Sequence, residues 1–225
     1  RSEFITHCAA EGGHLHVLKR LREKGVPLAL PEVFSISLQN GQLEVAKWLR
    51  EIGMELGPYA IDEAAGSGDL ETLKWVREHG CQWSSSTFGW AASNGGWDVL
   101  KWLREQGCPW GDGAIWGAAQ KGRIDVVKWL RDQGCPWDDR ASLFAARAGH
   151  FEMLKWLKEQ GCPGFDTILP GYSDMLSFAC EGGFLDIAIW AKENGCHEHL
   201  DDINYCRLAA EGGHLNILKW LREQG

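Results

Sequence analysis

The chain has 225 residues, of which 44% are hydrophobic and 24% charged, and its 31 acidic residues outnumber the 23 basic ones. It is too apolar to be disordered, and a formal net charge of -8 argues against DNA or RNA as a partner, because nucleic-acid binders normally gather Lys and Arg on one face. No apolar run reaches the roughly 18 residues of a membrane-spanning helix and no signal peptide is visible, so we expect a soluble protein without membrane contact.

A ten-residue phrase recurs along the chain: KWLREQGCPW at 101–110 returns as KWLRDQGCPW at 128–137. Aligning the chain on this phrase gives eight copies, most of them 27 residues apart. Such a period indicates a solenoid, because one unit cannot bury its own apolar face and must stack on its neighbours. We predict a single array with approximate repeats at 1–27, 28–55, 56–82, 83–109, 110–136, 137–163, 164–197 and 198–225.

Two glycines divide each repeat into two short helices. The first glycine follows the first helix, at Gly13, Gly41, Gly68, Gly95, Gly122, Gly149, Gly183 and Gly213. The second ends the second helix and supplies its left-handed C-terminal position, at Gly25, Gly53, Gly80, Gly107, Gly134, Gly161, Gly195 and Gly225. Between the two glycines, apolar residues recur every two to four positions and form a stripe that must be buried. The first helices carry small pairs such as Ala64-Ala65 and Ala118-Ala119, which predict a close packing neighbour.

The segments AAEGGHLHVLKRLREKG at 9–25 and AAEGGHLNILKWLREQG at 209–225 resemble the core of the ankyrin repeat family, Ala-Ala-x-x-Gly-His-Leu-x-x-Val-x-x-Leu-Leu-x-x-Gly. The resemblance covers all eight units and implies an all-α, helix-turn-helix solenoid. The family's repeat has about 33 residues, and its Thr-Pro-Leu-His opening is missing here, so we expect shortened hairpin fingers. A tryptophan-rich second helix is similar to ankyrin sets expanded in large DNA viruses of amoebae and in parasitic or algal protists.

The resemblance implies a module that binds a partner protein on the concave face of the inner helices. It suggests a pathogen effector that captures host signalling proteins, with kinases as the candidate class. The alternative is a structural or targeting array attached to a catalytic or F-box domain elsewhere in a longer protein. No constellation marks a nucleophile with its base, so we expect no enzyme and no cofactor. We also expect a monomer in the cytoplasm or nucleus, or in the host cytoplasm for a delivered effector.

Cysteine and histidine residues raise the question of a disulfide framework or a metal site. Five cysteines share one repeat slot where the family has a small alanine, which favours buried, reduced thiols and a reducing compartment: Cys81, Cys108, Cys135, Cys162 and Cys196. The segment CHEHLDD at 196–202 has the residue types of a weak metal site, but we expect a solvated acidic loop and no bound metal. His14, His150 and His214 match the family's turn histidine, so a structural hydrogen bond is expected.

The candidate binding residues occupy the slots that vary between copies, around the alanine pair of the inner helix. We centre the site on Trp90, Phe144 and Arg147, because aromatic residues and Arg dominate most binding surfaces. The other candidates are Glu63, Ser93, Asn94, Gln120, Lys121, Arg140 and Phe178. Trp116 is a weaker candidate, because its ring could fill the space left by Gly89 in the preceding repeat.

Two further features have open alternatives. The segment GFDTILPGYSD at 164–174 adds seven residues, and it is either a binding projection that includes Tyr172 or a packed loop that fills a gap. Trp83, Trp110 and Trp137 share a turn slot and form either a stacking ladder or separate packing contacts. The last repeat carries no polar substitution, so we expect either a longer parent chain or a dimer or unusual cap at this end.

Overall fold

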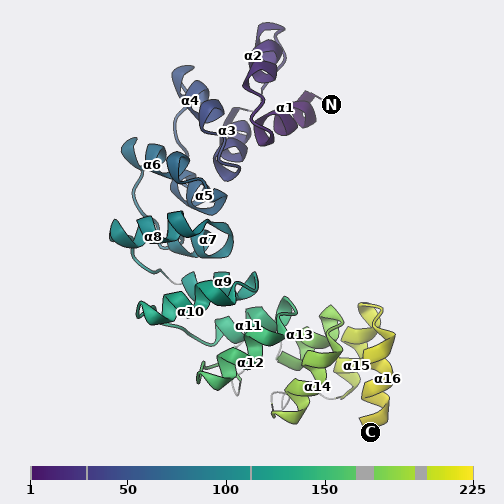
Figure 1. The fold of residues 1–225 in the computed structure, drawn as a ribbon. Helices are drawn as coiled ribbons and strands as arrows, with labels where there is room; N and C mark the ends of the chain where they lie inside the picture. Colours follow the sequence, from purple (N-terminus) through teal and green to yellow (C-terminus); the bar gives the residue numbers. More distant parts are fainter. Residues whose placement is uncertain (1, 29, 112, 166–174, 196–201, 225) are drawn as a thin grey trace. The chain divides into compact units, whose positions relative to one another are not determined.

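The computed structural model describes residues 2–28, 30–111, 113–165, 175–195 and 202–224, and these ranges contain sixteen helices and no strand (Figure 1). The helices form eight consecutive pairs, one in each predicted repeat. We call the first helix of a pair the inner helix and the second the outer helix. The inner helices are α1 (Ser2–Glu11), α3 (Leu30–Gln39), α5 (Ala60–Ser67), α7 (Thr87–Asn94), α9 (Ala114–Gln120), α11 (Arg140–Arg147), α13 (Met175–Gly182) and α15 (Asp202–Glu211). The outer helices are α2 (Leu15–Glu23), α4 (Leu43–Glu51), α6 (Leu70–Glu78), α8 (Trp97–Glu105), α10 (Ile124–Asp132), α12 (Phe151–Glu159), α14 (Leu185–Glu193) and α16 (Leu215–Gln224).

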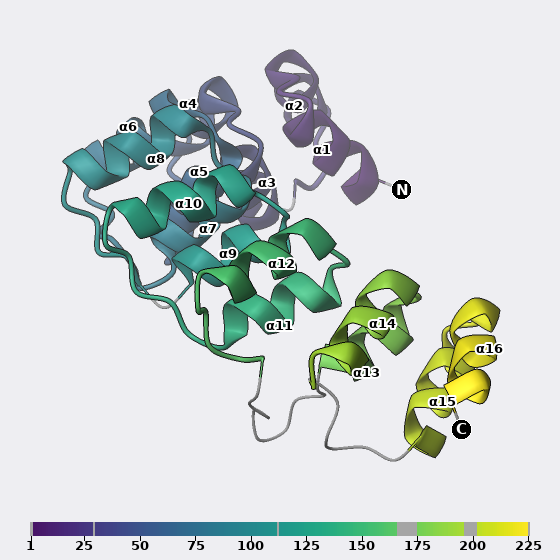
Figure 2. The ribbon, with the colours of Figure 1, turned by 60° about the horizontal axis from the view of Figure 1, so that its bottom comes forward.

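The chain divides into two compact units, residues 1–114 and 115–225. In the first unit the inner helices α1, α3, α5 and α7 pack one after another, and in the second unit α11, α13 and α15 do the same (Figure 2). In the pairs other than α9 and α10, the outer helix packs on the inner helix, as α6 does on α5 and α12 on α11. No helix of the described ranges combines the length and the apolarity that crossing a membrane requires.

Small residues allow the inner helices to approach closely. Ala64, Ala65, Ala118 and Ala119 have no exposed surface, and the equivalent residues of most other repeats are also buried. Large apolar side chains of the outer helices, such as Leu100, are also fully buried. The predicted reason for the alanine pairs, a close packing neighbour, is confirmed.

The glycine at the end of each outer helix has the predicted left-handed conformation wherever the structure describes it, with φ between 69° and 94°. After α8, for example, Gly107 has φ 69° and its N–H donates to the carbonyl of Arg104. The glycine after the inner helix also has a positive φ in seven repeats. Gly95 differs, with φ -69° and ψ 158°.

The residue after the inner-helix glycine links consecutive repeats. His150 Nε2 donates to the carbonyl of Gln120 at 3.0 Å, and His214 Nε2 donates to that of Glu181 at 2.9 Å. Gln42 Nε2 makes the same bond to Glu11, also at 2.9 Å. The structural hydrogen bond predicted for the histidines is therefore confirmed at these two positions, and Gln42 is an equivalent that the sequence reasoning missed. His14, in the first repeat, is exposed.

Three arginines lie over the turn tryptophans. The guanidinium carbons of Arg77, Arg104 and Arg131 lie 4.4, 4.6 and 4.0 Å from the ring centroids of Trp83, Trp110 and Trp137, respectively. Arg131 also donates to the carbonyl of Cys135 at 2.7 Å, so one side chain closes the helix end and covers the ring. Each turn ring also meets another aromatic side chain nearly edge-on: Trp83 meets Trp102, Trp110 meets Phe88 and Trp137 meets Trp156. These contacts favour the packing alternative for the turn tryptophans.

A double-mutant cycle on Arg131 and Trp137 is expected to give a coupling energy of about 1 kcal/mol, because the half-buried guanidinium lies directly over the indole. Urea denaturation of R131A, W137A and the double variant measures it. Arg131→Lys is the control, since it keeps the charge but loses the planar stack and should recover less than half of the coupling. Strictly additive single effects would contradict the stacking interpretation.

The seven cysteines of the described residues are free thiols, and Cys108, Cys135 and Cys162 are buried as predicted. Burial raises the pKa of Cys108 to about 12, with a further contribution from the Asp62 carboxylate. Burial likewise raises the pKa of Cys162 to about 12. Cys81 is only partly buried, so the prediction is wrong there; its turn has Gln82 where the turns of Cys108, Cys135 and Cys162 have proline. Cys196 lies outside the described residues.

Candidate functional site

The predicted site residues fall in both units. Glu63 lies on α5 and Trp90, Ser93 and Asn94 on α7, all in the first unit. The second unit holds Trp116 and Gln120 on α9, Lys121 directly after it, Arg140, Phe144 and Arg147 on α11, and Phe178 on α13. Tyr172 lies outside the described residues, as does most of the 164–174 segment. Each unit therefore presents its own candidate surface.

The second unit brings three of the predicted residues together. Trp116 stacks on Phe144, with ring centroids 4.9 Å apart and planes 29° from parallel, and both rings are half-buried. Arg147 is exposed one turn further along α11, and its guanidinium carbon lies 5.8 Å from the centroid of Phe178. Phe178 is only 7% exposed, so its ring supports Arg147 and offers little surface of its own.

The proposal that Trp116 fills the space beside Gly89 stays a prediction. A Cβ built on Gly89 would lie 3.1 to 3.2 Å from backbone atoms of Gly113. Backbone atoms of Gly113 therefore border the space beside Gly89. Within the second unit, Trp116 makes an offset stack with Phe144, an arrangement that aromatic pairs favour.

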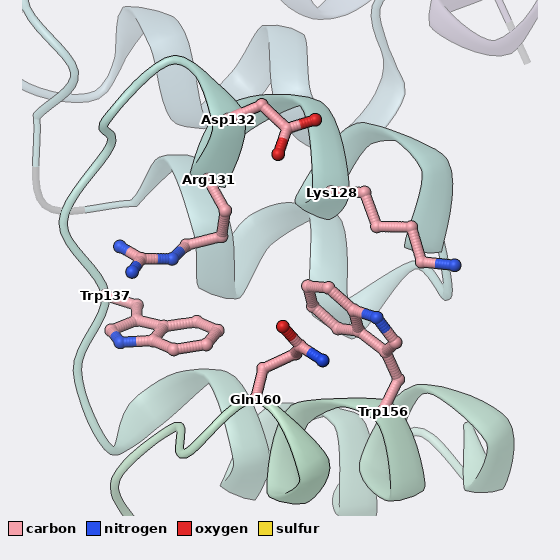
Figure 3. A pocket seen from close by; sticks show the side chains of 6 residues that line it. All are labelled: Lys128, Arg131, Asp132, Trp137, Trp156 and Gln160. Atoms are coloured by element: carbon pink, nitrogen blue, oxygen red, sulfur yellow. The ribbon is translucent and has the colours of Figure 1, made fainter.

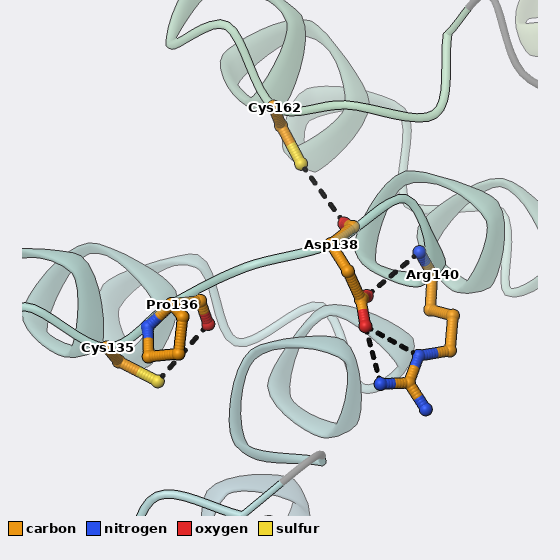
Figure 4. A network of polar contacts seen from close by, with 5 residues as sticks. All are labelled: Cys135, Pro136, Asp138, Arg140 and Cys162. Atoms are coloured by element: carbon orange, nitrogen blue, oxygen red, sulfur yellow. Dashed lines mark hydrogen bonds and ion pairs between the residues drawn. The ribbon is translucent and has the colours of Figure 1, made fainter.

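The basic residues of the second unit differ in their freedom to bind. Arg140 is held by Asp138, whose Oδ2 accepts from Arg140 Nε at 2.7 Å and lies 2.5 Å from Nη2 (Figure 4). The same aspartate accepts through its backbone carbonyl from the thiol of Cys162 at 3.7 Å. Arg140 is thus part of a packed turn, whereas Lys121 and Arg147 are exposed to solvent.

In the first unit, Trp90 is the exposed aromatic residue of α7. It is 49% exposed, and its ring lies against α5, where a Cβ on Gly66 would be 3.3 Å from ring atom Cε3. Ser93 bonds its own helix through the carbonyl of Gly89 at 2.9 Å. Asn94 is exposed at the helix end. Gly66 therefore provides the flat surface on which the indole rests.

A hollow of about 350 Å³ lies between α3, the 54–59 turn and α5, and Glu63 forms part of its lining. We call it the α3–α5 hollow. Its apolar lining comes from Pro31, Phe34 and Leu38 of α3 together with Met54, Pro58 and Tyr59 of the turn. The sequence analysis predicted Glu63 but missed the turn residues, because it considered only the variable positions around the alanine pair of the inner helix.

A second hollow, of about 440 Å³, lies along the outer helices α10 and α12 (Figure 3). Trp137 and Trp156 form its aromatic walls, with Gln160 between them, and Lys128, Arg131 and Asp132 line the α10 side. Arg131 is already occupied by its contacts with Trp137 and Cys135. Packing contacts of the tryptophan-rich outer helices thus explain the aromatic lining of this hollow.

No group of three or more His, Cys, Asp or Glu side chains in the described residues is arranged to hold a metal ion. The 196–202 segment, which carries the residue types of a weak metal site, lies outside these ranges except for Asp202 at the start of α15.

Comparison with known proteins agrees with the helical-hairpin architecture. No curated protein matches the chain. Residues 115–157 match the family model for ankyrin repeats. The ankyrin repeat domain of human ASB11 is similar in structure, with a TM-score of 0.50 and 21% sequence identity, over 83% of this chain and 96% of that chain. The predicted all-α repeat fold is confirmed: the chain has the fold of an ankyrin repeat domain, and its residues 115–157 are similar in sequence to ankyrin repeats.

Proposed function

We propose that the chain is a protein-recognition module that binds a partner protein through its inner helices. The observation that supports this most directly is the stacked, half-buried pair of Trp116 and Phe144 beside the exposed Arg147. Aromatic and arginine side chains carry most of the energy in protein interfaces, and a ring already held in a stack loses little conformational entropy on binding. Ankyrin repeats in general mediate protein–protein interactions, which agrees with this assignment.

Trp90 is the corresponding candidate of the first unit, because half of its surface is exposed on a rigid support. We propose that the eight helical hairpins act as one monomeric, non-catalytic array in a reducing compartment. The free, buried thiols support that choice of compartment.

A narrower proposal concerns the partner. The tryptophan-rich repeats resemble ankyrin sets of large DNA viruses and protists, which supports an effector that captures a host signalling protein such as a kinase. An array that positions a catalytic or F-box domain of a longer protein is the alternative. Affinity capture from host lysate, followed by mass spectrometry, separates the two: a captured kinase supports the first, and recovery of chaperones alone contradicts it.

Phe144→Ala is expected to weaken partner binding by about 2 kcal/mol, roughly 30-fold in Kd. Biolayer interferometry with the captured partner measures this, and Arg147→Ala should have an effect of similar size. Glu152→Ala, a change at an exposed residue of the outer helix α12, is the control and should leave Kd within twofold. If Phe144→Ala instead costs several kcal/mol of stability with unchanged affinity in the folded fraction, Phe144 belongs to the core and the proposed site is wrong.

A further inference from the structure

We infer that the α3–α5 hollow of the first unit binds a linear peptide segment that presents an apolar side chain and, two residues further on, an arginine. This inference gives a ligand class to a second surface of the proposed recognition module, and it rests on that function only in requiring the ligand to be a protein segment. The hollow is separate from the Trp116–Phe144 surface, which belongs to the other unit.

The size and lining of the hollow suit one apolar side chain and its backbone. Its volume of about 350 Å³ is near the lower end of the range of ligand pockets, roughly 300 to 1,000 Å³. Phe34 and Leu38 are 3% and 1% exposed, so they form only a fixed floor, and the accessible apolar surface comes from Pro31, Met54, Pro58 and Tyr59. Met54 of the turn is partly exposed and adaptable in shape, which allows aliphatic side chains of different outline to fit.

The negative charge at the edge of the hollow favours a ligand that carries a basic group. Two carboxylates line it, whereas no Lys or Arg of the described part of the chain does. Glu55 is already paired, with its Oε1 at 2.7 Å from Arg50 Nη1. Glu63 Oε1 accepts only from neutral donors among the described residues, namely Ser35 Oγ and, at 3.2 Å, Gln39 Nε2. These bonds hold the Glu63 carboxylate in place while leaving its charge available to a cation from outside.

Tyr59 favours arginine over lysine as that cation. It lies directly before α5, and 69% of its surface is exposed, so its ring face is accessible beside the hollow. A guanidinium can stack on an aromatic ring and bind a carboxylate at the same time, which an ammonium group does less well. In an extended peptide, residues i and i+2 point to the same side, and this spacing gives the motif apolar-x-Arg.

Selection of random peptides displayed on phage against the whole chain tests the proposal. We expect enriched peptides to carry Leu, Ile, Met or Phe followed two residues later by Arg. A fluorescein-labelled synthetic peptide of that sequence should bind at least tenfold more weakly to Glu63→Gln in fluorescence polarisation, and several-fold more weakly to Tyr59→Ala. Glu63→Gln keeps the acceptor oxygen for Ser35 and Gln39, so the fold should be preserved. Glu44→Gln, at an exposed carboxylate of the outer helix α4, is the matched control and should change Kd by less than twofold.

A peptide with Gln in place of Arg completes a double-mutant cycle with the Glu63→Gln protein. It should bind the unchanged protein more weakly, and Glu63→Gln should then have no additional effect. Enriched peptides whose affinity is insensitive to Glu63→Gln would overturn the proposal, as would failure to enrich any peptide. Enrichment of acidic peptides that are lost on Arg147→Ala would also overturn it, but would support the proposed function of the second unit. The proposed function fails separately, when a captured partner binds Phe144→Ala and Arg147→Ala as tightly as the unchanged protein.

Discussion

Asp62→Ala is expected to lower the free energy of unfolding of the first unit by about 3 kcal/mol. The carboxylate is 4% exposed and accepts from two hydroxyl groups. Ser84 Oγ lies 2.7 and 2.8 Å from the two carboxylate oxygens, and Thr87 Oγ1 lies 2.6 Å from Oδ1. Hydrogen bonds to a charged acceptor contribute more than neutral ones, and their loss leaves polar groups unsatisfied in a buried site. The bonds also join α5 to the turn before α7, so the next repeat loses an anchor.

Urea denaturation followed by tryptophan fluorescence and by circular dichroism measures the change. Asp69→Ala is the matched control: Asp69 caps α6 by accepting from the Thr72 N–H at 2.7 Å, a local bond whose loss should cost only about 1 kcal/mol. Equal losses for the two variants would show that the Asp62 network adds nothing beyond an ordinary cap. A stable Asp62→Ala protein would mean that the buried hydroxyl groups find other partners.

Gly95→Ala is expected to cost about 3 kcal/mol, although Gly95 has an ordinary negative φ. The reason is close backbone approach. An added Cβ would lie 2.7 Å from the carbonyl oxygen of Ala91 and 2.9 Å from that of Ala65, so neither neighbour can move without shifting a helix.

The adjacent glycine provides a control for Gly95→Ala in the same loop. A Cβ on Gly96 would meet only the carbonyl oxygen of Gly68, at 3.3 Å, and its φ of -73° is equally compatible with alanine. Gly96→Ala should therefore cost less than about 1 kcal/mol. Thermal unfolding of both variants in parallel measures the difference, and similar small shifts in Tm would refute the close-approach explanation.

The repeat period was sufficient to predict the helices. Residues at the same position of different repeats have the same structural role for the same local physical reason. Gly107 ends an outer helix for the same reason as Gly134, and Ala118-Ala119 pack as Ala64-Ala65 do. Alignment of the copies was therefore enough to predict eight helical pairs and the residues between them.

The solvent exposure of the side chain at a given repeat position could not be predicted in this way, because it depends on the residues of the neighbouring repeat. Phe144 and Phe178 share one slot, yet Phe144 is half-buried on Trp116 while Phe178 is 7% exposed. The α3–α5 hollow has a similar origin. It is lined by residues of α3 and of the turn that carries Met54 and Tyr59, and the sequence of this turn is not shared with the other copies.

The bond from His150 to Gln120 makes the stability of the sixth repeat partly a property of the fifth. If the array is treated as a one-dimensional lattice in which each repeat is a site, such a bond adds to the coupling energy between neighbouring sites. This coupling energy sets how many hairpins unfold together. In the fourth repeat this position is Gly96, which has no side chain to make the bond; there the Asp62 network joins the same two repeats. The array thus keeps coupling at that joint with different chemistry, and a single substitution there would shorten the cooperative length while leaving each hairpin able to form.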